Sequence, residues 1–436
     1  MDGALTRIIV GMDRWSRLFV ALLVGTVVAC GGAPVDTPSG AGAASSPSVA
    51  PSQSRAAATD ARPPTATATG ASTFPGVELR PLTGVQGDFV FAARLVYEPN
   101  GQGIGTYELW AIPAAAGGSA RVVLRYPRDG VAEAWPTRYV SPDGRRYAFQ
   151  IDRGDGTHRI VIADLKSGAL TWLRTDDSKM HDGQPVWDPT GARIAFNRVE
   201  GNGMSFGVWV VNADGTGLKQ AVSGANAPTY IYHWTPDGRW VAFSQNVGYH
   251  FVEVATGSRL AMDNVVSGDA SWRNNSPRLI ARGWESAAGG DLQYIFTTDA
   301  PAGQRTVLLR ASTTSDSLGN PRWRPGTDEY LYGRYAGGIA QTLVRSLSGS
   351  ERALPSQEMG SPAWSPDGSS IAYIGGVERT PSYGPGGAVV NVGFRSTQIR
   401  LVGADGTGDR LLYELTASDG PAGWCVCNDG LTIRHY

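Results

Sequence analysis

Residues 364–373 read WSPDGSSIAY. Proline holds its own φ near the value that the second position of a tight turn needs, and glycine readily takes the positive φ that such a turn requires. After the turn, Ile371 and Tyr373 are two residues apart, so they face the same side of an extended strand. The stretch therefore predicts a β-hairpin whose second strand packs one face against a core.

The same pattern returns along the chain. Close copies are VSPDGRRYAF from Val140, where valine takes the place of tryptophan, WDPTGARIAF from Trp187 and WTPDGRWVAF from Trp234. Looser copies begin at Trp272, Trp323 and Trp424. The seven copies recur about every 47 residues, a spacing typical of propellers and other repeat folds.

A second hairpin pattern accompanies the first. Its seven instances begin at Tyr107, His158, Val208, His250, Leu292, Gln341 and Gln398. The first of them precedes every WSPDG-type copy, and none follows the copy at Trp424. We therefore predict an all-β propeller of seven four-stranded blades, with six or eight as the error range. Its ring is closed by pairing of the chain ends, residues 424–427 beside residues 89–97.

The W-S-P-D-G-x-x-I-A-Y pattern resembles the PD40, or WD40-like, repeat of the β-propeller in bacterial TolB proteins. The resemblance covers roughly residues 87–436. It implies a partner among envelope proteins, because the TolB propeller docks a peptidoglycan-associated lipoprotein. The α/β domain of TolB has no counterpart in this sequence. The same repeat also forms the propellers of prolyl peptidases, whose hydrolase half is likewise without a counterpart here.

The first thirty residues have the pattern of an export signal. Three arginines precede an apolar run over residues 18–29, which is too short to span a bilayer. The sequence VVAC ending at Cys30 resembles the lipobox of bacterial lipoproteins, which implies that Cys30 carries acyl chains. An ordinary secretory signal with a chance cysteine is the alternative, and Met12 is an alternative start. We expect an exported protein, anchored through Cys30 to the cytoplasmic membrane's outer face or to an outer membrane.

Residues 31–76 are rich in Ala, Ser, Pro, Thr and Gly and contain few large apolar side chains. Such a segment cannot bury enough surface to offset its ordering entropy, so it predicts a disordered tether. The sequence thus divides into a signal peptide with a lipobox (1–30), a tether (31–76) and a TolB-like propeller domain (77–436).

The loops that lead into the innermost strands surround one opening of a propeller's channel. Here we expect them at residues 128–138, 176–185, 223–233, 263–270, 312–321, 356–362 and 416–423. The third holds Tyr230, Tyr232 and His233, and Trp135 can join them from the first. Aromatic side chains with a polar group are enriched at interfaces, so these residues predict a site for a protein or peptide, or less readily a glycan. The alternative is that these aromatic side chains only cover the end of the domain and bind no partner.

The competing hypothesis is a metal-dependent glycan lyase or hydrolase centred on the channel. His181 and His233 lie in corresponding linkers, and Asp182 and Asp269 are nearby acids. Polar loop residues without a catalytic role are the alternative, because no histidines share a metal-ligand spacing. Residues 203–207 match G-x-S-x-G by chance, since that motif needs a strand-to-helix turn in a parallel sheet. We predict no catalytic residues, no metal and no cofactor.

Charge and cysteine content narrow the functions further. With 38 basic and 39 acidic residues the net charge is −1, and no basic stripe points to nucleic acid. Cys425 and Cys427 point to one face if their strand is regular, near the upper separation for a disulfide. Two free thiols are the favoured interpretation, and a disulfide across a bulge is the alternative.

Overall fold

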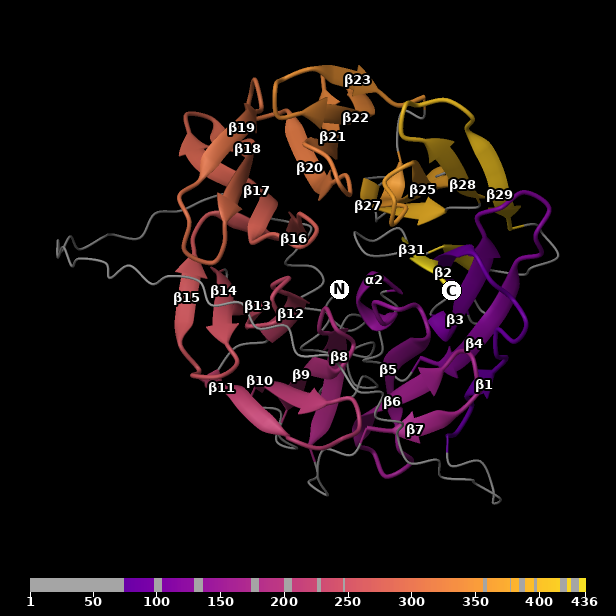
Figure 1. Ribbon diagram of the computed structural model, residues 1–436. Coiled ribbons are helices and arrows are strands. Elements are labelled where there is room, and N and C mark those ends of the chain that lie inside the picture. The colour runs from indigo at the N-terminus through magenta and orange to yellow at the C-terminus, as the bar shows by residue number, and fades with distance from the viewer. Residues whose placement is uncertain are drawn as a thin grey trace, which may run out of the picture. The chain divides into compact units, whose positions relative to one another are not determined.

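The computed structural model describes residues 74–97, 104–128, 136–173, 180–199, 206–225, 229–245, 248–355, 359–376, 378–383, 389–395, 398–415, 422–424 and 431–436. All of them belong to one compact unit, residues 72–436. Their strands form seven antiparallel blades around a common centre (Figure 1). The predicted all-β, seven-bladed propeller is therefore confirmed. The signal segment and the tether as far as residue 73 lie outside the described residues.

Blades 3 to 6 each have four strands that follow one another from the centre outward. Blade 3 contains β8 (His181–Trp187), β9 (Arg193–Val199), β10 (Phe206–Asn212) and β11 (Lys219–Ala225). Blade 4 contains β12 (Thr229–Trp234), β13 (Trp240–Gln245), β14 (Gly248–Glu253) and β15 (Arg259–Met262). Blade 5 contains β16 (Val265–Trp272), β17 (Arg278–Ala287), β18 (Gly290–Asp299) and β19 (Thr306–Arg310). Blade 6 contains β20 (Ser317–Trp323), β21 (Glu329–Ala336), β22 (Ile339–Ser346) and β23 (Glu351–Ala353).

Blades 2 and 7 depart from this plan. Blade 2 contains β5 (Arg146–Asp152), β6 (His158–Asp164) and β7 (Leu170–Trp172), and its inner position is held by the short helix α2 (Pro136–Tyr139) and a bridge from Val140 to Tyr147. Blade 7 contains β24 (Gly360–Trp364), β25 (Ser370–Gly375), β28 (Gln398–Gly403) and β29 (Arg410–Glu414). Between β25 and β28 the chain inserts a separate hairpin, β26 (Glu378–Tyr383) with β27 (Val389–Arg395). The sequence patterns revealed neither α2 nor this hairpin.

Blade 1 closes the ring as predicted, with strands from both ends of the chain. From the N-terminal side come β2 (Asp88–Tyr97), β3 (Ile104–Pro113), β4 (Arg121–Pro127) and the short outer strand β1 (Glu78–Leu79). From the C-terminal side, β30 (Ala422–Trp424) and β31 (Leu431–His435) both pair with the inner edge of β2. The closing strand thus extends almost to the last residue, where Tyr436 and Gly87 exchange two backbone hydrogen bonds.

The interpretation of Trp424 as the start of a seventh WSPDG-type hairpin is wrong. Because β30 and β31 pair with the same edge of β2 in the same direction, they form one interrupted inner strand and do not fold back on each other. The hairpin is unnecessary here, since β2 already supplies the second strand. Trp424 pairs with Arg94, whereas the true Trp slot of this blade holds another residue, as shown below.

The register defines a Trp slot in every blade, as the inner-strand residue that pairs with the second residue of the next strand. The slot contains Trp187, Trp234, Trp272, Trp323 and Trp364 in blades 3 to 7, Val140 in blade 2 and Arg434 in blade 1. In three blades the indole N–H crosses to the preceding blade. Trp187 donates to the Tyr139 carbonyl, Trp234 to that of Val186 and Trp364 to that of Arg322. The predicted packing of the tryptophans between blades is confirmed for these three, while the side chain of Trp424 lies outside the described residues.

The Asp-Gly turns behave as turns. Gly238 has a φ of 66°, which a residue with a Cβ rarely adopts, and the Asp237 carboxylate accepts hydrogen bonds from the Thr235 hydroxyl and the Arg239 N–H. The arginine that follows such a turn also links blades. For example, Arg193 of blade 3 stacks 4.6 Å from the Trp234 ring and donates to the Gly238 carbonyl at 2.7 Å. The repeat motif therefore fixes each hairpin and its contact with the neighbour.

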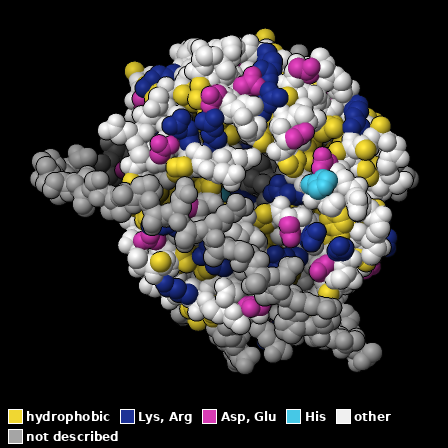
Figure 2. Space-filling view, in the orientation of Figure 1, with side chains coloured by type: hydrophobic (Ala, Val, Ile, Leu, Met, Phe, Trp, Pro, Cys, Tyr) yellow, Lys and Arg dark blue, Asp and Glu magenta, His cyan; other side chains and the backbone are white. Residues whose placement is uncertain are grey.

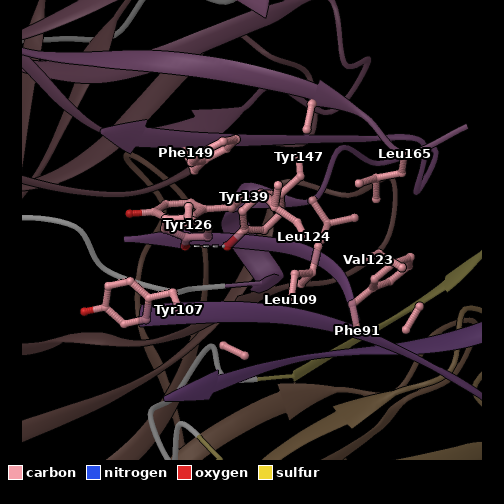
Figure 3. Packing of buried hydrophobic residues seen from close by; sticks show 14 of the residues in the cluster. Phe91, Tyr107, Leu109, Val123, Leu124, Tyr126, Tyr139, Tyr147, Phe149 and Leu165 are labelled. Carbon is pink, nitrogen blue, oxygen red and sulfur yellow. Dashed lines mark hydrogen bonds between the residues drawn. The ribbon is translucent and has the colours of Figure 1, made fainter. Parts of the chain in front are cut away.

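Apolar clusters fill the spaces between adjacent blades. Figure 3 shows the one between blades 1 and 2, where aromatic and aliphatic side chains from both sheets interdigitate. In it the hydroxyls of Tyr126 and Tyr147 lie 3.2 Å apart, so two fully buried phenols satisfy each other. Packing of this kind leaves the inner strands as rigid walls. Across the described part of the chain, no helix has the length and apolar character that crossing a bilayer would demand.

Candidate functional site

The inner strands enclose a cavity of about 270 Å³ at the centre of the ring. Its lining comes from α2, β8, β12, β16, β20 and β31 and from the turns beside them. The described lining residues are Arg138, Val140, Pro142, Val186, Trp187, Asp188, Pro189, Tyr232, His233, Trp234, Ala270, Ser271, Trp272, Arg322 and Arg434. The cavity therefore combines aromatic walls with three guanidinium groups, drawn from parts of the chain that are far apart in sequence.

One sequence position supplies much of this lining. The residue directly before the Trp slot is Val186 in blade 3, His233 in blade 4, Ser271 in blade 5 and Arg322 in blade 6, and all four border the cavity. Each of these inner strands carries a register shift a few residues before its tryptophan. A bulge re-aims the side chains that follow it.

The bulges also explain an unusual backbone feature. Gln184, Asn320 and Ser361 each lie three residues before a slot tryptophan and have φ values of 53°, 51° and 47°. A positive φ is uncommon outside glycine and marks a residue whose conformation the surroundings impose. The inner strands are thus held in a shape that their local propensity would not select, which is typical of sites that present side chains to a ligand.

His233 is the neutral polar group of the cavity. The hydroxyl of Tyr249 lies 2.6 Å from its Nε2, and its ring packs edge-on against Trp272 with centroids 5.5 Å apart. Burial lowers the pKa of His233 to about 3, and the positive charges of Arg138 and Arg322 act in the same direction. At neutral pH the ring is uncharged and offers no charge of its own to a ligand.

Arg138 is held in place by blade 4. Its Nη1 donates to the carbonyl of Ile231 at 3.0 Å, and its guanidinium lies 5.4 Å from the centre of the Tyr232 ring. That ring in turn stacks on Tyr249 with centroids 5.5 Å apart. A guanidinium fixed by a carbonyl and an aromatic face has lost much of its rotamer freedom before any ligand arrives.

Arg322 and Arg434 complete the basic lining from blades 6 and 1. The Nη1 atom of each donates to the carbonyl of the residue before it, at 3.1 Å in both cases. The described lining contains one acid, Asp188. Its carboxylate is engaged by its own turn and by Arg193, whose Nε lies 2.9 Å from Oδ2. Within the described lining, basic side chains therefore outnumber acidic ones.

The predicted interface residues are only partly brought together. Tyr232 and His233 border the cavity, while Tyr230 packs against the apolar cluster between blades 4 and 5. All three lie in β12, so the expected loop is in fact an inner strand. Asp269 lies in β16, again not in a loop, and its side chain is outside the described part of the structure. Trp135, Cys30, Cys425 and Cys427 also lie outside the described residues.

His181 and His233 do not occupy corresponding positions, and this prediction is wrong. His181 is six residues before its slot tryptophan, whereas His233 is directly before Trp234, so they lie at different levels of the inner wall. His181 instead meets His158, with 2.9 Å between their Nδ1 atoms. Burial and then the neighbouring His158 lower the pKa of His181.

Asp182, the proposed catalytic acid of the alternative hypothesis, is enclosed in a salt bridge. It is 1% exposed, and the guanidinium of Arg198 contacts both of its oxygens at 2.6 and 3.0 Å. A carboxylate held in this way supports the fold of blade 3. Among the residues that the structure describes, no three His, Cys, Asp or Glu side chains form a group that could hold a metal ion.

The sequence analysis missed Arg138, Arg322 and Arg434. Arg322 had a usable signal, because it stands directly before the repeat tryptophan at the position that His233 occupies in blade 4. Arg434 had none, since the closing strand carries no repeat motif and its register became visible only through pairing with Phe89. Arg138 was hidden by α2, which replaces the expected inner strand.

The comparisons with known proteins add likenesses of fold. No family model matches the sequence, and no curated protein matches it. Among solved structures, TolB from Acinetobacter baumannii is 14% identical with a TM-score of 0.40, over 79% of this chain and 66% of that one. A putative TolB from Agrobacterium tumefaciens is 14% identical with a TM-score of 0.36, over 81% of this chain and 99% of that one.

A peptidase is among the similar structures as well. The acylaminoacyl peptidase of Pyrococcus horikoshii is 13% identical with a TM-score of 0.43, over 76% of this chain and 51% of that one. The chain thus spans about half the length of this peptidase and 66% of the first TolB. These likenesses concern the architecture and carry no activity or partner to this chain. Its own sheet topology makes the chain a seven-bladed β-propeller.

Proposed function

We propose that this protein is an exported, lipid-anchored β-propeller that binds a protein or peptide at its central cavity and catalyses no reaction. The observation that carries the proposal is the cavity itself. Rigid inner strands from four blades, together with α2 and β31, direct tryptophan, tyrosine and arginine side chains into one space. These residue types dominate the binding energy of protein interfaces, particularly when they are fixed before the partner arrives.

A blocked cavity tests the binding role. Ala270 is a small residue of the lining that also packs against the apolar cluster between blades 4 and 5, so Ala270→Trp fills the space, and circular dichroism checks that the variant is folded. Its matched control is Ala261→Trp, on the exposed outer strand of blade 4. We expect crosslinking in intact cells to recover an envelope protein with the wild type and the control and to lose it with Ala270→Trp. Equal recovery with both variants would place the partner elsewhere. Metal-dependent turnover of a polysaccharide, with no protein recovered, would instead favour the enzyme hypothesis.

The anchor is tested separately. The lipobox pattern at Cys30 supports attachment of acyl chains, and two or more chains hold a protein on a membrane where one is marginal. We expect Cys30→Ser to abolish incorporation of labelled palmitate and to move the protein from the membrane fraction to the soluble fraction. A variant that stays in the membrane fraction without label would show that another element anchors the chain.

A further inference from the structure

Arg434 breaks the rule that the other blades follow. The Trp slot holds tryptophan in blades 3 to 7 and valine in blade 2, but in blade 1 it holds a charged residue. A residue that violates a repeat's own pattern, without an evident structural gain, is a candidate for function. The packing around it is close. A Cβ added to Gly144 would lie 3.0 Å from the Cβ of Arg434, so the stem of the arginine is wedged against the first turn of blade 2.

The charge of Arg434 has no carboxylate partner among the described residues. Toward the described residues its side chain makes one hydrogen bond, from Nη1 to the Ile433 carbonyl at 3.1 Å, and its buried Nε finds no acceptor among them. Burial alone lowers the pKa of Arg434 to about 10, which still leaves the group charged at neutral pH. A guanidinium carries five N–H donors and cannot accept, so Arg434 has donors left for an acceptor that enters the cavity.

The neighbours of Arg434 indicate the kind of acceptor. Arg138 and Arg322 border the same cavity, and the acid in its described lining, Asp188, is bound to Arg193. Guanidinium groups match the planar, bidentate geometry of a carboxylate. The rest of the described lining is mostly apolar, with Trp187, Trp234 and Trp272 among its residues. Bare inorganic anions gain nothing from such a wall, whereas a carboxylate attached to an organic group can bury its carbon skeleton there.

We propose that the central cavity is a carboxylate-binding site, in which Arg434, Arg322 and Arg138 receive the carboxylate of a peptide's C-terminus. The volume of about 270 Å³ is near the lower end for ligand pockets and accommodates one or two residues of a chain end. The inference rests on the proposed function, because it names the chemical group through which a partner would enter the cavity. On the face seen in Figure 2, Lys and Arg side chains lie near the centre of the ring, with Asp and Glu side chains among them.

Titration of the full-length protein tests the site directly. The probes are N-acetyl-tetra-alanine with a free C-terminus, the same peptide with a C-terminal amide, and glutarate. Binding is followed by calorimetry and by the fluorescence of the protein's tryptophans. We expect the free acid to bind at least tenfold more tightly than the amide and to weaken as salt rises. Equal affinity of acid and amide would overturn the proposal. Tighter binding of glutarate than of either peptide would keep the carboxylate chemistry but assign it to a free small acid.

Three variants connect binding to the residue. Arg434→Gln is expected to weaken binding of the free acid at least tenfold, and Arg434→Lys, which keeps the charge, to restore much of it. Arg310→Gln, an exposed arginine on the outer strand of blade 5, is the matched control and should bind as the wild type does. Because Arg434→Gln removes a half-buried charge that no described carboxylate compensates, its thermal midpoint should not fall, and this measurement shows that the variant is folded. Undiminished binding by a folded Arg434→Gln would overturn the proposal.

Failure of this site and failure of the proposed function are distinguishable. If crosslinking recovers a partner that Ala270→Trp loses, yet the wild type binds acid and amide alike, the protein-binding role stands and the carboxylate is excluded. If the titration succeeds and no partner is recovered, the carboxylate site stands and the envelope-protein partner of the proposed function fails.

Discussion

At the scale of single residues, the buried carboxylates of the described chain, Glu108, Asp182 and Asp188, each lie against an arginine. Glu108 shows the usual arrangement. Its side chain is 2% exposed and accepts hydrogen bonds from Arg94 at 3.1 Å, from Arg125 at 2.6 Å and from the indole of Trp110 at 2.9 Å. Removing such a carboxylate leaves the buried positive charge of its arginine partner without a neighbouring negative charge.

Glu108→Gln is therefore expected to lower the free energy of unfolding by about 3 kcal/mol, because Arg94 would be left buried beside a neutral amide. Urea unfolding followed by circular dichroism measures the change. Glu285→Gln is the control, since the pair of Glu285 with Arg310 is exposed and such pairs contribute about 0.5 kcal/mol or less. A similar small effect in both variants would contradict the stabilising role of the buried pair.

His233 makes stability depend on pH. Its pKa is about 3 in the folded protein against an ordinary 6.5, so below pH 6.5 the unfolded chain binds more protons than the folded one. The contribution of His233 is complete above pH 6.5 and falls as the pH decreases, by about 2 kcal/mol between pH 6.5 and 5. His233→Gln should remove this part of the slope in urea titrations at pH 7 and 5. The slope that remains includes His181, whose pKa is also lowered.

An unchanged slope in His233→Gln would mean that the folded protein accommodates the imidazolium. Glutamine suits the comparison because its amide oxygen can still accept from the hydroxyl of Tyr249.

At the scale of elements, the repeated hairpin motif has two structural roles. Its Asp-Gly turn fixes the connection between the inner strand and the next, and its tryptophan reaches the preceding blade. The blades nevertheless differ in whether the indole N–H of this tryptophan donates a hydrogen bond. Trp234 donates to the Val186 carbonyl at 3.0 Å, while the buried Nε1 of Trp323 has no hydrogen-bond partner.

This difference predicts unequal effects of one substitution. Trp234 and Trp323 are 3% and 4% exposed, so replacing either by phenylalanine removes a similar buried volume. Trp234→Phe also removes the hydrogen bond to the Val186 carbonyl, whereas Trp323→Phe removes a buried donor that has no acceptor among the described residues. We expect Trp234→Phe to cost about 1 to 2 kcal/mol more in the free energy of unfolding. Equal losses in chemical denaturation would show that packing alone decides the contribution of the repeat tryptophan.

At the scale of the whole molecule, the ring is closed by noncovalent pairing of the chain ends. Five residue pairs join β31 to β2, from Asp88 with His435 to Ala92 with Leu431, and Leu431 and Ile433 are buried in the cluster between blades 7 and 1. Without β31 the edge of β2 would be unpaired, and an exposed strand edge is a template for association with other chains.

Removal of residues 431–436 is therefore expected to lower the thermal midpoint by several degrees and to produce concentration-dependent aggregates in light scattering. A chain extended by a short Gly-Ser segment after Tyr436 is the control for a change at the C-terminus, and it should unfold as the wild type does. A truncated protein that stays monomeric with an unchanged midpoint would show that β30 alone closes the ring.

The sequence by itself determined the fold class, the number of blades, the closure by the two ends and the role of the tryptophans. Turn residues and strand alternation are local features of the sequence. Each copy alone is a weak indication of a hairpin, but seven copies about every 47 residues indicate a repeat fold. It also identified Tyr232 and His233 as channel residues, although it assigned them to a loop, because a bulged inner strand does not show the regular alternation that marks a strand.

Only the tertiary structure decided which side chains share the cavity. Arg138, Arg322 and Arg434 are separated by more than a hundred residues in sequence, and each comes from a different kind of element, a short helix, an inner strand and the closing strand. Their common position follows from the closure of the ring, and no local pattern encodes it. The slot that holds Arg434 exists only through its pairing with β2, so its departure from the repeat could not be seen before the two chain ends were placed side by side.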